Sequence, residues 1–235
     1  MQSTPRHISF NRVIDLTHTL TTDFPSYNGV QDVFIETKKH FAVDGVNVKQ
    51  WTVREHIGTH IDAPLHFSAD GCSCDQIPAE DLVVPLIIID IAARAQDNAD
   101  TALTPDDIAA FESKHGPIPR GCCVAMHSGW GRHVHTQKYR NADDTGCMHF
   151  PGFHAETAHA LIARGVKGLG VDSMSIDVGP TKAFEAHYAW LPNGRWAMEG
   201  LANLDQLPPV GATIAVGAPK IAGATGGPSR VFGFV

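Results

Sequence analysis

Four side chains that commonly bind metal ions lie within one short segment, His-Ile-Gly-Thr-His-Ile-Asp-Ala-Pro-Leu-His at residues 56–66. His56, His60 and Asp62 are the strongest candidate ligands, and His66 follows them closely. Two imidazoles and a carboxylate suit a divalent cation that keeps one coordination position open for water. The sequence therefore predicts a catalytic metal site on this segment.

The spacing of these residues requires a bend in the backbone. On a straight strand His56 and His60 would lie roughly 13 Å apart, at about 3.3 Å per residue, which is too far to share one ion. A helix would bring residues four apart together, but Gly58, Thr59 and Pro64 disfavour a helix here. We expect a strand end that curls into a loop at Gly58, because glycine permits such a bend.

A second group of polar residues lies downstream. His187 and Glu199 are separated by twelve residues, a spacing that by itself specifies no site. Asp172, Ser175 and Asp177 follow an expected strand, where catalytic loops often begin. Considered alone, these residues fit an ordinary polar loop better than a site.

The elements expected to position these residues are mostly strands. They are expected at 11–17, 33–38, 48–55, 84–91, 122–127, 166–172, 213–216 and 230–235, from alternating or continuous apolar patterns. A helix is expected after the N-cap residue Thr104, with Pro105 and Asp107 in its first turn and Gly116 just after its end, and another helix is expected at 154–164. The strands outnumber the helices, and the helices come late in the chain and one at a time. This order indicates an α+β domain spanning residues 1–235. The polar stretch 131–150 is expected to be a surface insertion, either a lid or a dimer contact.

Composition restricts the class of protein. The chain has 235 residues, of which 43% are hydrophobic and 18% charged, as in an ordinary globular domain. A net charge of −7 provides no basic surface for nucleic acid. No apolar run approaches about 20 residues, so no membrane span is expected.

Residues 1–12 lack the apolar core of a signal peptide, which points to the cytoplasm. Five cysteines, without C-x-x-C spacing, predict reduced thiols.

The pattern H-x-G-T-H-x-D-x-P-x-H at 56–66 resembles the signature of the cyclase-like metal hydrolases, a family that includes bacterial kynurenine formamidases and isatin hydrolases. Further segments are similar to that family, so the resemblance covers nearly the whole chain. They are residues 13–18, 66–71, 75–78, 170–177, 217–220 and 226–230.

The resemblance implies a β-rich swivelling β/β/α fold with a mixed sheet and a few flanking helices, usually in a dimer. It implies that His56, His60 and Asp62 hold a first ion. In formamidase-like members Asp62 would bridge to a second ion held by His187 and Glu199, whereas isatin-hydrolase-like members would hold one manganese. The expected cofactor is therefore Mn²⁺ or Zn²⁺, as one or two ions.

The resemblance also bears on the substrate. Segments 127–131 and 150–154 look more like the isatin-hydrolase branch, and Tyr27 stands where formamidases commonly carry tryptophan. Phe24, Tyr27 and Trp51 are expected to stack on a planar aryl substrate, with plain core packing as the alternative for all three.

The expected activity is hydrolysis of an amide C–N bond by a metal-activated water, with His66 or Glu199 transferring the proton. No G-x-S-x-G nucleophile elbow is present. The expected substrate is a small aromatic amide: a cyclic amide such as isatin, or alternatively N-formylkynurenine in tryptophan catabolism. A non-catalytic metal or small-molecule binding protein and an enzyme of dehydration or ring closure are the rival functions. A homodimer or higher homo-oligomer is expected, without nucleic acid or membrane partners.

Overall fold

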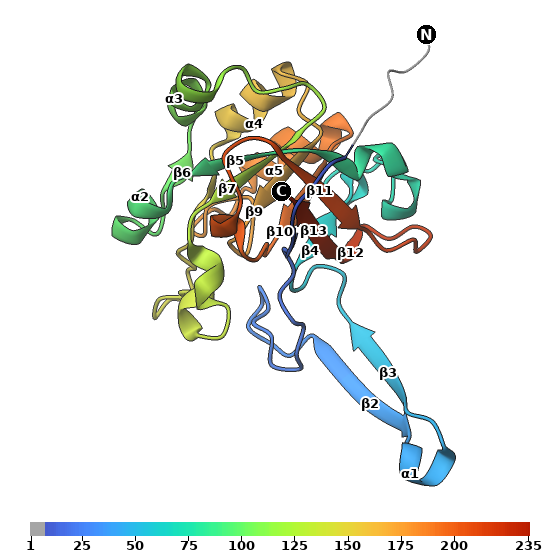
Figure 1. Cartoon of the computed structure of the whole chain (residues 1–235). Helices are drawn as coiled ribbons and strands as arrows, with labels where there is room; N and C mark the ends of the chain where they lie inside the picture. The colour runs from blue at the N-terminus through green and yellow to red at the C-terminus, as the bar shows by residue number, and fades with distance from the viewer. Residues whose placement is uncertain (1–7) are drawn as a thin grey trace.

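A mixed sheet of nine strands forms the body of the molecule within residues 8–235, the part that this computed structural model describes (Figure 1). The strand order is β1-β13-β11-β5-β7-β9-β10-β4-β12. The strands are β1 (Val13–Asp15), β4 (His60–Asp62), β5 (Val83–Asp90), β7 (Cys123–His127), β9 (Gly168–Val171), β10 (Trp196–Glu199), β11 (Ala212–Gly217), β12 (Gly226–Pro228) and β13 (Arg230–Phe234).

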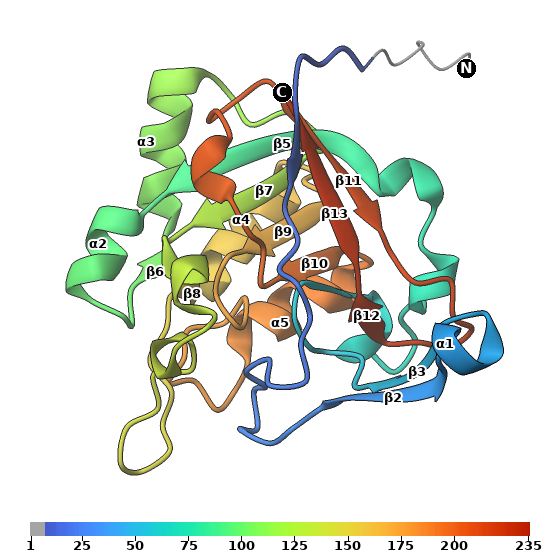
Figure 2. The same ribbon diagram turned by 60° about the horizontal axis from the view of Figure 1, so that its bottom comes forward.

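The centre of the sheet is parallel and its two sides are antiparallel. β5, β7, β9 and β10 lie side by side in parallel (Figure 2), and β1, β13 and β11 on one side, with β4 and β12 on the other, run antiparallel to their neighbours. The mixed sheet with few helices confirms the predicted α+β class. The central strands read as continuous apolar runs because both of their faces are covered.

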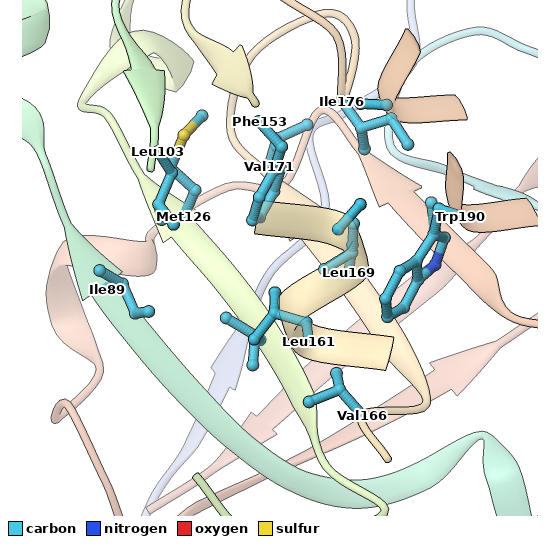
Figure 3. Packing of buried hydrophobic residues seen from close by; sticks show 14 of the residues in the cluster. Ile89, Leu103, Met126, Phe153, Leu161, Val166, Leu169, Val171, Ile176 and Trp190 are labelled. Atoms are coloured by element: carbon cyan, nitrogen blue, oxygen red, sulfur yellow. The ribbon is translucent and has the colours of Figure 1, made fainter. Parts of the chain in front are cut away.

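Helices cover one face of this sheet. They are α3 (Pro105–His115), α4 (Ala155–Ala163) and α5 (Glu185–Trp190). Leu161 of α4 and Trp190 of α5 pack against Leu169 of β9 in the core beneath them (Figure 3). Side chains of β5 contribute to the cores on both faces of the sheet: Ile87 belongs to this core, whereas Ile88 belongs to the core on the opposite face. The buried side chains of β5 therefore pack into apolar cores on both faces of the sheet.

The start of α3 is as predicted. Thr104 and Asp107 form a reciprocal capping box, and Pro105 occupies the first turn. Further short elements are α2 (Ala92–Asp97) and the two-stranded pair β6 (Ala102–Leu103) and β8 (Gly152–Phe153).

A hairpin arm projects from the body (Figure 1). It consists of β2 (Val33–Lys39), β3 (Val48–Val53) and the short helix α1 (Phe41–Asp44) at its tip. The sequence predicted a half-buried strand at 48–55, but β3 is exposed along nearly its whole length. The alternating pattern is correct for a strand, but beyond the base of the arm, where Val33 and Val53 pack against the body, nothing in the described chain covers either face.

The insertion at 131–150 is less superficial than its polar composition suggested. Tyr139 and Phe150 are almost fully buried, and the indole N–H of Trp130 donates to the carbonyl of Tyr139. The carboxylate of Asp172 accepts hydrogen bonds from Ser128 and from the backbone N–H of Trp130. Asp172 therefore holds the segment that leads into the insertion.

Two predictions from composition can be checked here. All five cysteines are free thiols. Among residues 8–235, no helix has both the length and the apolar character needed to cross a bilayer. The expectation drawn from residues 1–12 falls largely outside the described residues.

Candidate metal centre and active-site pocket

The pairing of β10 with β4 brings two segments of the site together. Glu199 lies directly opposite His60 in this antiparallel ladder, with Asp62 two residues further along β4. Because side chains alternate along a strand, these three side chains project to one face, while Ile61 and Met198 point into the core on the other face. The register therefore gathers one imidazole and two carboxylates on one face of the sheet, next to its edge strand β12.

His56 reaches the same place through the bend predicted at Gly58. The φ angle of Gly58 is +68°, a left-handed conformation that glycine adopts readily. The chain turns back here, so Nδ1 of His56 lies 2.7 Å from Oδ1 of Asp62. The carbonyl of Gly58 also accepts a hydrogen bond of 3.0 Å from Nδ1 of His60.

α5 supplies His187 from the opposite side. The carboxylate of Asp177 accepts from Nδ1 of His187 and from the backbone N–H of Ala186 at 2.7 Å. Both the helix start and the ring orientation of His187 thus depend on Asp177, one of the polar residues noted in the sequence. The six-residue α5 itself was not predicted, because so short a helix shows no clear periodicity.

The ligand-type atoms have the spacing of a coordination shell. Nε2 of His60 lies 3.3 Å from Asp62 and 3.4 Å from Glu199, and Nε2 of His187 lies 3.5 Å from Asp62 and 3.2 Å from Glu199. Two ligands at about 2.0–2.1 Å from a tetrahedral Zn²⁺ lie about 3.3 Å apart. The separations therefore match the edges of a metal polyhedron better than they match hydrogen bonds.

Two atoms at the centre of this cluster have no hydrogen-bond partner. They are Nε2 of His60 and Oδ2 of Asp62, and both residues are buried. Buried polar atoms are nearly always satisfied, so each of these two atoms indicates that a cation belongs beside it. The donor set of imidazoles and carboxylates fits such an ion.

The charges in the cluster also favour a cation. Burial would lower the pKa of His60, but the carboxylates of Asp62 and Glu199 outweigh it and raise that pKa to about 10. Burial would also lower the pKa of His187, but three carboxylates raise this pKa well above its usual value, those of Asp177, Asp62 and Glu199. Burial and Asp62 act to raise the pKa of Glu199, but His187 and His60 hold it at about 2. The site therefore stabilises positive charge.

A cavity of about 270 Å³ opens onto this cluster. Seven of the site residues predicted from the sequence line it, namely Phe24, Tyr27, His56, His60, His66, His187 and Glu199, while Asp62 is fully buried beside His60. Trp51 is not brought to this cavity: it lies on β3 of the arm and is 72% exposed. Trp51 therefore cannot contact a substrate in the cavity of its own chain, contrary to the prediction.

His66 lies in the pocket beside the predicted ligands. Its ring stacks on the ring of His56 with centroids 3.7 Å apart. Burial lowers the pKa of His66 to about 4, so the ring is neutral at pH 7 and has a lone pair on one nitrogen.

Sequence reasoning missed several aromatic residues of the pocket. Phe67, Tyr139 and Phe184 line the cavity, and Ser175 lies among them. Phe67 directly follows the metal-binding motif, which is the one local signal that could have found it. Phe184 (φ +51°) and Tyr139, which lies in the insertion, carry no signal that distinguishes them from core residues.

Another group of metal-binding residue types, Asp143, Cys147 and His149, lies on the insertion. None of the three lines the cavity. Nδ1 of His149 pairs with Asp100 at 2.9 Å, so an ion pair accounts for this group.

Comparisons with known proteins agree with this geometry. The Cyclase family model matches residues 14–178, a segment that contains the whole 56–66 motif. The chain belongs to the Cyclase family. Among curated members, an isatin hydrolase of Roseibium aggregatum is 32% identical over 77% of this chain and 72% of its own length. A kynurenine formamidase of Salinibacter ruber is 26% identical over 93% of this chain and 95% of its own length.

Solved structures extend the family match past residue 178. Isatin hydrolase A from Labrenzia aggregata bound to benzyl benzoate superposes with a TM-score of 0.88 at 36% identity, covering 95% of this chain and 93% of that one. The resemblance inferred from the sequence motif is thereby confirmed, and the common fold includes the part of the chain that carries His187 and Glu199.

Proposed function

We propose that this chain is a metal-dependent hydrolase that cleaves the amide C–N bond of an aryl substrate through a metal-activated water. The observation that carries the proposal is the pair of buried, unpartnered atoms, Nε2 of His60 and Oδ2 of Asp62. His60 lines a cavity of the size of a small ring system, and Asp62 is buried beside it. The named activities of two relatives, an isatin hydrolase and a kynurenine formamidase, support it.

The five candidate ligands divide into two sets that share Asp62. His56 and His60 face one of its oxygens, which fits a first ion. His187 faces the other oxygen and, with Glu199, fits a second ion. Mn²⁺ and Zn²⁺ are the proposed cofactors, since both accept imidazole and carboxylate ligands.

An ion held there supplies Lewis acidity and lowers the pKa of water bound to it toward about 7. Both oxygens of Glu199 face histidine nitrogens, and one also accepts from the backbone N–H of Ile176 at 2.8 Å. Glu199 is therefore proposed as a ligand. His66, neutral and in the pocket, is proposed to take the proton from the attacking water and deliver it to the leaving nitrogen as the C–N bond breaks.

The pocket walls favour a planar aromatic substrate. Tyr27, Phe67 and Phe184 form one connected group of rings, with Phe184 6.3 Å from Tyr27 and 5.6 Å from Phe67 between centroids. Aromatic rings in such offset or edge contacts attract one another and a bound aryl group. A cyclic amide such as isatin is proposed first, and N-formylkynurenine is the alternative that the second relative's activity supports.

A substrate panel on metal-reconstituted protein tests the proposal. Isatin is coloured and its opened product is much less so, so loss of visible absorbance would report the first substrate. Release of formate from N-formylkynurenine would report the second. Tight metal binding without turnover of any amide would instead identify a binding protein, and ring closure of an amino acid carboxylate as the favoured direction would identify a cyclising enzyme.

His60→Ala, with metal analysis, tests the role of the cluster directly. We expect metal content and turnover to fall together in this variant. Turnover that persists after the ion has been lost would contradict the proposed mechanism.

A homo-oligomer is proposed from the arm. An isolated two-stranded hairpin is marginally stable in water, yet the arm carries large exposed apolar side chains, which include Phe34, Phe41, Val43 and Trp51. A second copy of this chain is the proposed cover, and in that assembly Trp51 could contribute to the partner's pocket. Sedimentation analysis of wild type and Phe41→Glu tests this: the wild type should be oligomeric and the variant should dissociate.

A cytoplasmic location stays a prediction, which cell fractionation would test.

A further inference from the structure

A chain of three hydrogen-bonded side chains leads from the surface to the metal-binding cluster. Glu55 directly precedes the motif, and Thr225 directly precedes β12. Oγ1 of Thr225 donates to Oε2 of Glu55 at 2.6 Å, and the backbone N–H of Thr225 donates to the other carboxylate oxygen at 3.2 Å. Oγ1 of Thr225 also lies 2.9 Å from Nε2 of His56. None of the sequence arguments pointed to Glu55 or Thr225.

The positions of the protons in this chain follow from donor and acceptor chemistry. A carboxylate only accepts hydrogen bonds, and a hydroxyl has one proton to donate. The hydroxyl proton of Thr225 is therefore committed to Glu55, and its oxygen remains as an acceptor toward His56. Nε2 of His56 must then carry a proton to donate.

This arrangement decides which nitrogen of His56 faces the cluster. In neutral imidazole one nitrogen carries the proton and the other carries a lone pair. With Nε2 protonated, the lone pair lies on Nδ1, which is 2.7 Å from Oδ1 of Asp62. Two lone pairs at this distance repel each other, so a positive charge must lie between them: a proton where no ion is bound, which makes the contact a hydrogen bond, or a divalent cation that takes the place of this proton.

Two neighbours also confine the ring of His56. His66 stacks on it at a centroid distance of 3.7 Å with the planes 18° apart. Beside it lies Gly226, where a Cβ atom would fall 2.7 Å from Cε1 of His56, closer than real side chains approach. The ring is thereby held in the plane in which Nε2 meets Thr225 and Nδ1 meets Asp62.

We infer that Thr225 and Glu55 are positioning residues that hold His56 in its Nε2–H tautomer and so present Nδ1 to a divalent cation. This inference rests on the proposed metal site. The other two histidines show the same logic with different partners: Nδ1 of His60 donates to a backbone carbonyl, and Nδ1 of His187 donates to Asp177. Outer partners of this kind set the tautomer of a ligand and raise its basicity. His56 differs in that its ligand nitrogen is Nδ1.

Metal affinity of the stripped protein tests the inference without relying on turnover. Thr225→Val keeps the shape of the side chain but has no hydroxyl, and Thr225→Ser, the matched control, keeps the hydroxyl. In a chelator competition with Mn²⁺ or Zn²⁺, we expect Thr225→Val to bind about 10- to 100-fold more weakly. Thr225→Ser should stay within a few-fold of wild type. Equal affinity of wild type and Thr225→Val would overturn the inference.

Glu55→Gln tests the origin of the effect. The new amide can donate to Thr225, which releases the hydroxyl proton toward His56, so we expect weaker binding although Thr225 is intact. Binding by Glu55→Gln that equals wild type would contradict the role of the carboxylate. Thermal unfolding of each variant separates a fold defect from a loss of metal affinity.

Nitrogen-15 NMR of the histidine rings provides a readout that a purely structural role would not change. In the Zn²⁺-loaded wild type, His56 should show a proton on Nε2, and in Thr225→Val this resonance should shift or broaden. A proton on Nδ1 of His56 in the Zn²⁺-loaded wild type would overturn the inference. Failure of the wild type itself to bind any ion would instead overturn the proposed function.

Discussion

The carboxylate of Asp177 accepts hydrogen bonds from Nδ1 of His187 and from the backbone at the start of the helix that carries this histidine. Nε2 of His187 is consequently directed at Asp62 and Glu199, at 3.5 and 3.2 Å. One carboxylate thus fixes both the position of a short helix and the tautomer of a candidate ligand on it.

Asp177→Asn should therefore weaken the binding of the second proposed ion selectively. The amide nitrogen cannot accept from the backbone or the ring, so His187 loses its fixed orientation. We expect about a 10- to 100-fold loss of affinity for one ion, measured by calorimetric titration of stripped protein, with the ion at His56 and His60 retained. Asp205→Asn, at an exposed position, is the control. Two unchanged binding steps in Asp177→Asn would refute this role.

His66→Ala should separate proton transfer from metal binding. If His66 moves the proton, its loss lowers kcat by about 10²–10⁴-fold and leaves the metal content of the protein unchanged. Glu199→Ala, in contrast, should lose metal, because both of its oxygens face histidine nitrogens. Stopped-flow assays combined with metal analysis distinguish the two. A metal-depleted His66→Ala protein would show that His66 is itself a ligand.

Tyr27→Ala should impair substrate binding more than the chemical step. The ring of Tyr27 faces the pocket, whereas its backbone carbonyl is held independently by the guanidinium of Arg140 at 3.2 Å. Loss of one aromatic contact of about 0.5–1.5 kcal/mol should raise KM for an aryl amide roughly 2- to 12-fold. Tyr27→Phe keeps the ring and should keep KM near wild type. An unchanged KM in Tyr27→Ala would place the substrate elsewhere in the cavity.

The capping box of α3 predicts how stability depends on pH. Burial alone would raise the pKa of Asp107, but hydrogen bonds from Arg94 and Thr104 hold this pKa below its ordinary value. An acid whose folded-state pKa is depressed stabilises the protein above its unfolded-state pKa of about 3.9, and this contribution is lost as the pH falls through the folded-state pKa.

Asp107→Asn should accordingly cost about 1 kcal/mol of unfolding free energy at pH 7. The difference from wild type should shrink as the pH approaches the folded-state pKa. Asp106→Asn, an exposed residue of the same turn, should cost only a few tenths of a kcal/mol. Urea unfolding at several pH values measures this, and a difference that is the same at every pH would argue against the charge of Asp107 as its source.

The metal-binding motif was predictable because its chemistry is local. Residues 56–62 contain three candidate ligands and the glycine that bends the chain, so spacing and backbone stereochemistry were enough to predict the bend at Gly58. The strand that follows the bend, β4, was not among the expected strands, because three residues are too few to show an alternating pattern. The central strand β5 was predictable for a similar reason, since a continuous apolar run requires cover on both faces.

The rest of the site depends on contacts between distant segments. Glu199 reaches His60 through strand pairing, and His187 arrives on a helix too short to leave a periodic signal. Tyr139 is buried although it comes from a polar insertion, because long-range packing determines its burial. The arm was misjudged for the opposite reason: the pattern of β3 describes a strand with a covered face, and that cover is not part of the same chain.

Anomalous diffraction from crystals grown with Mn²⁺ or Zn²⁺ tests the central claim most directly. The account predicts a strong anomalous peak within coordination distance of Nδ1 of His56, Nε2 of His60 and Asp62, with space for water on the pocket side. The absence of any anomalous peak at these side chains, in well-ordered crystals grown with millimolar metal, would contradict the account.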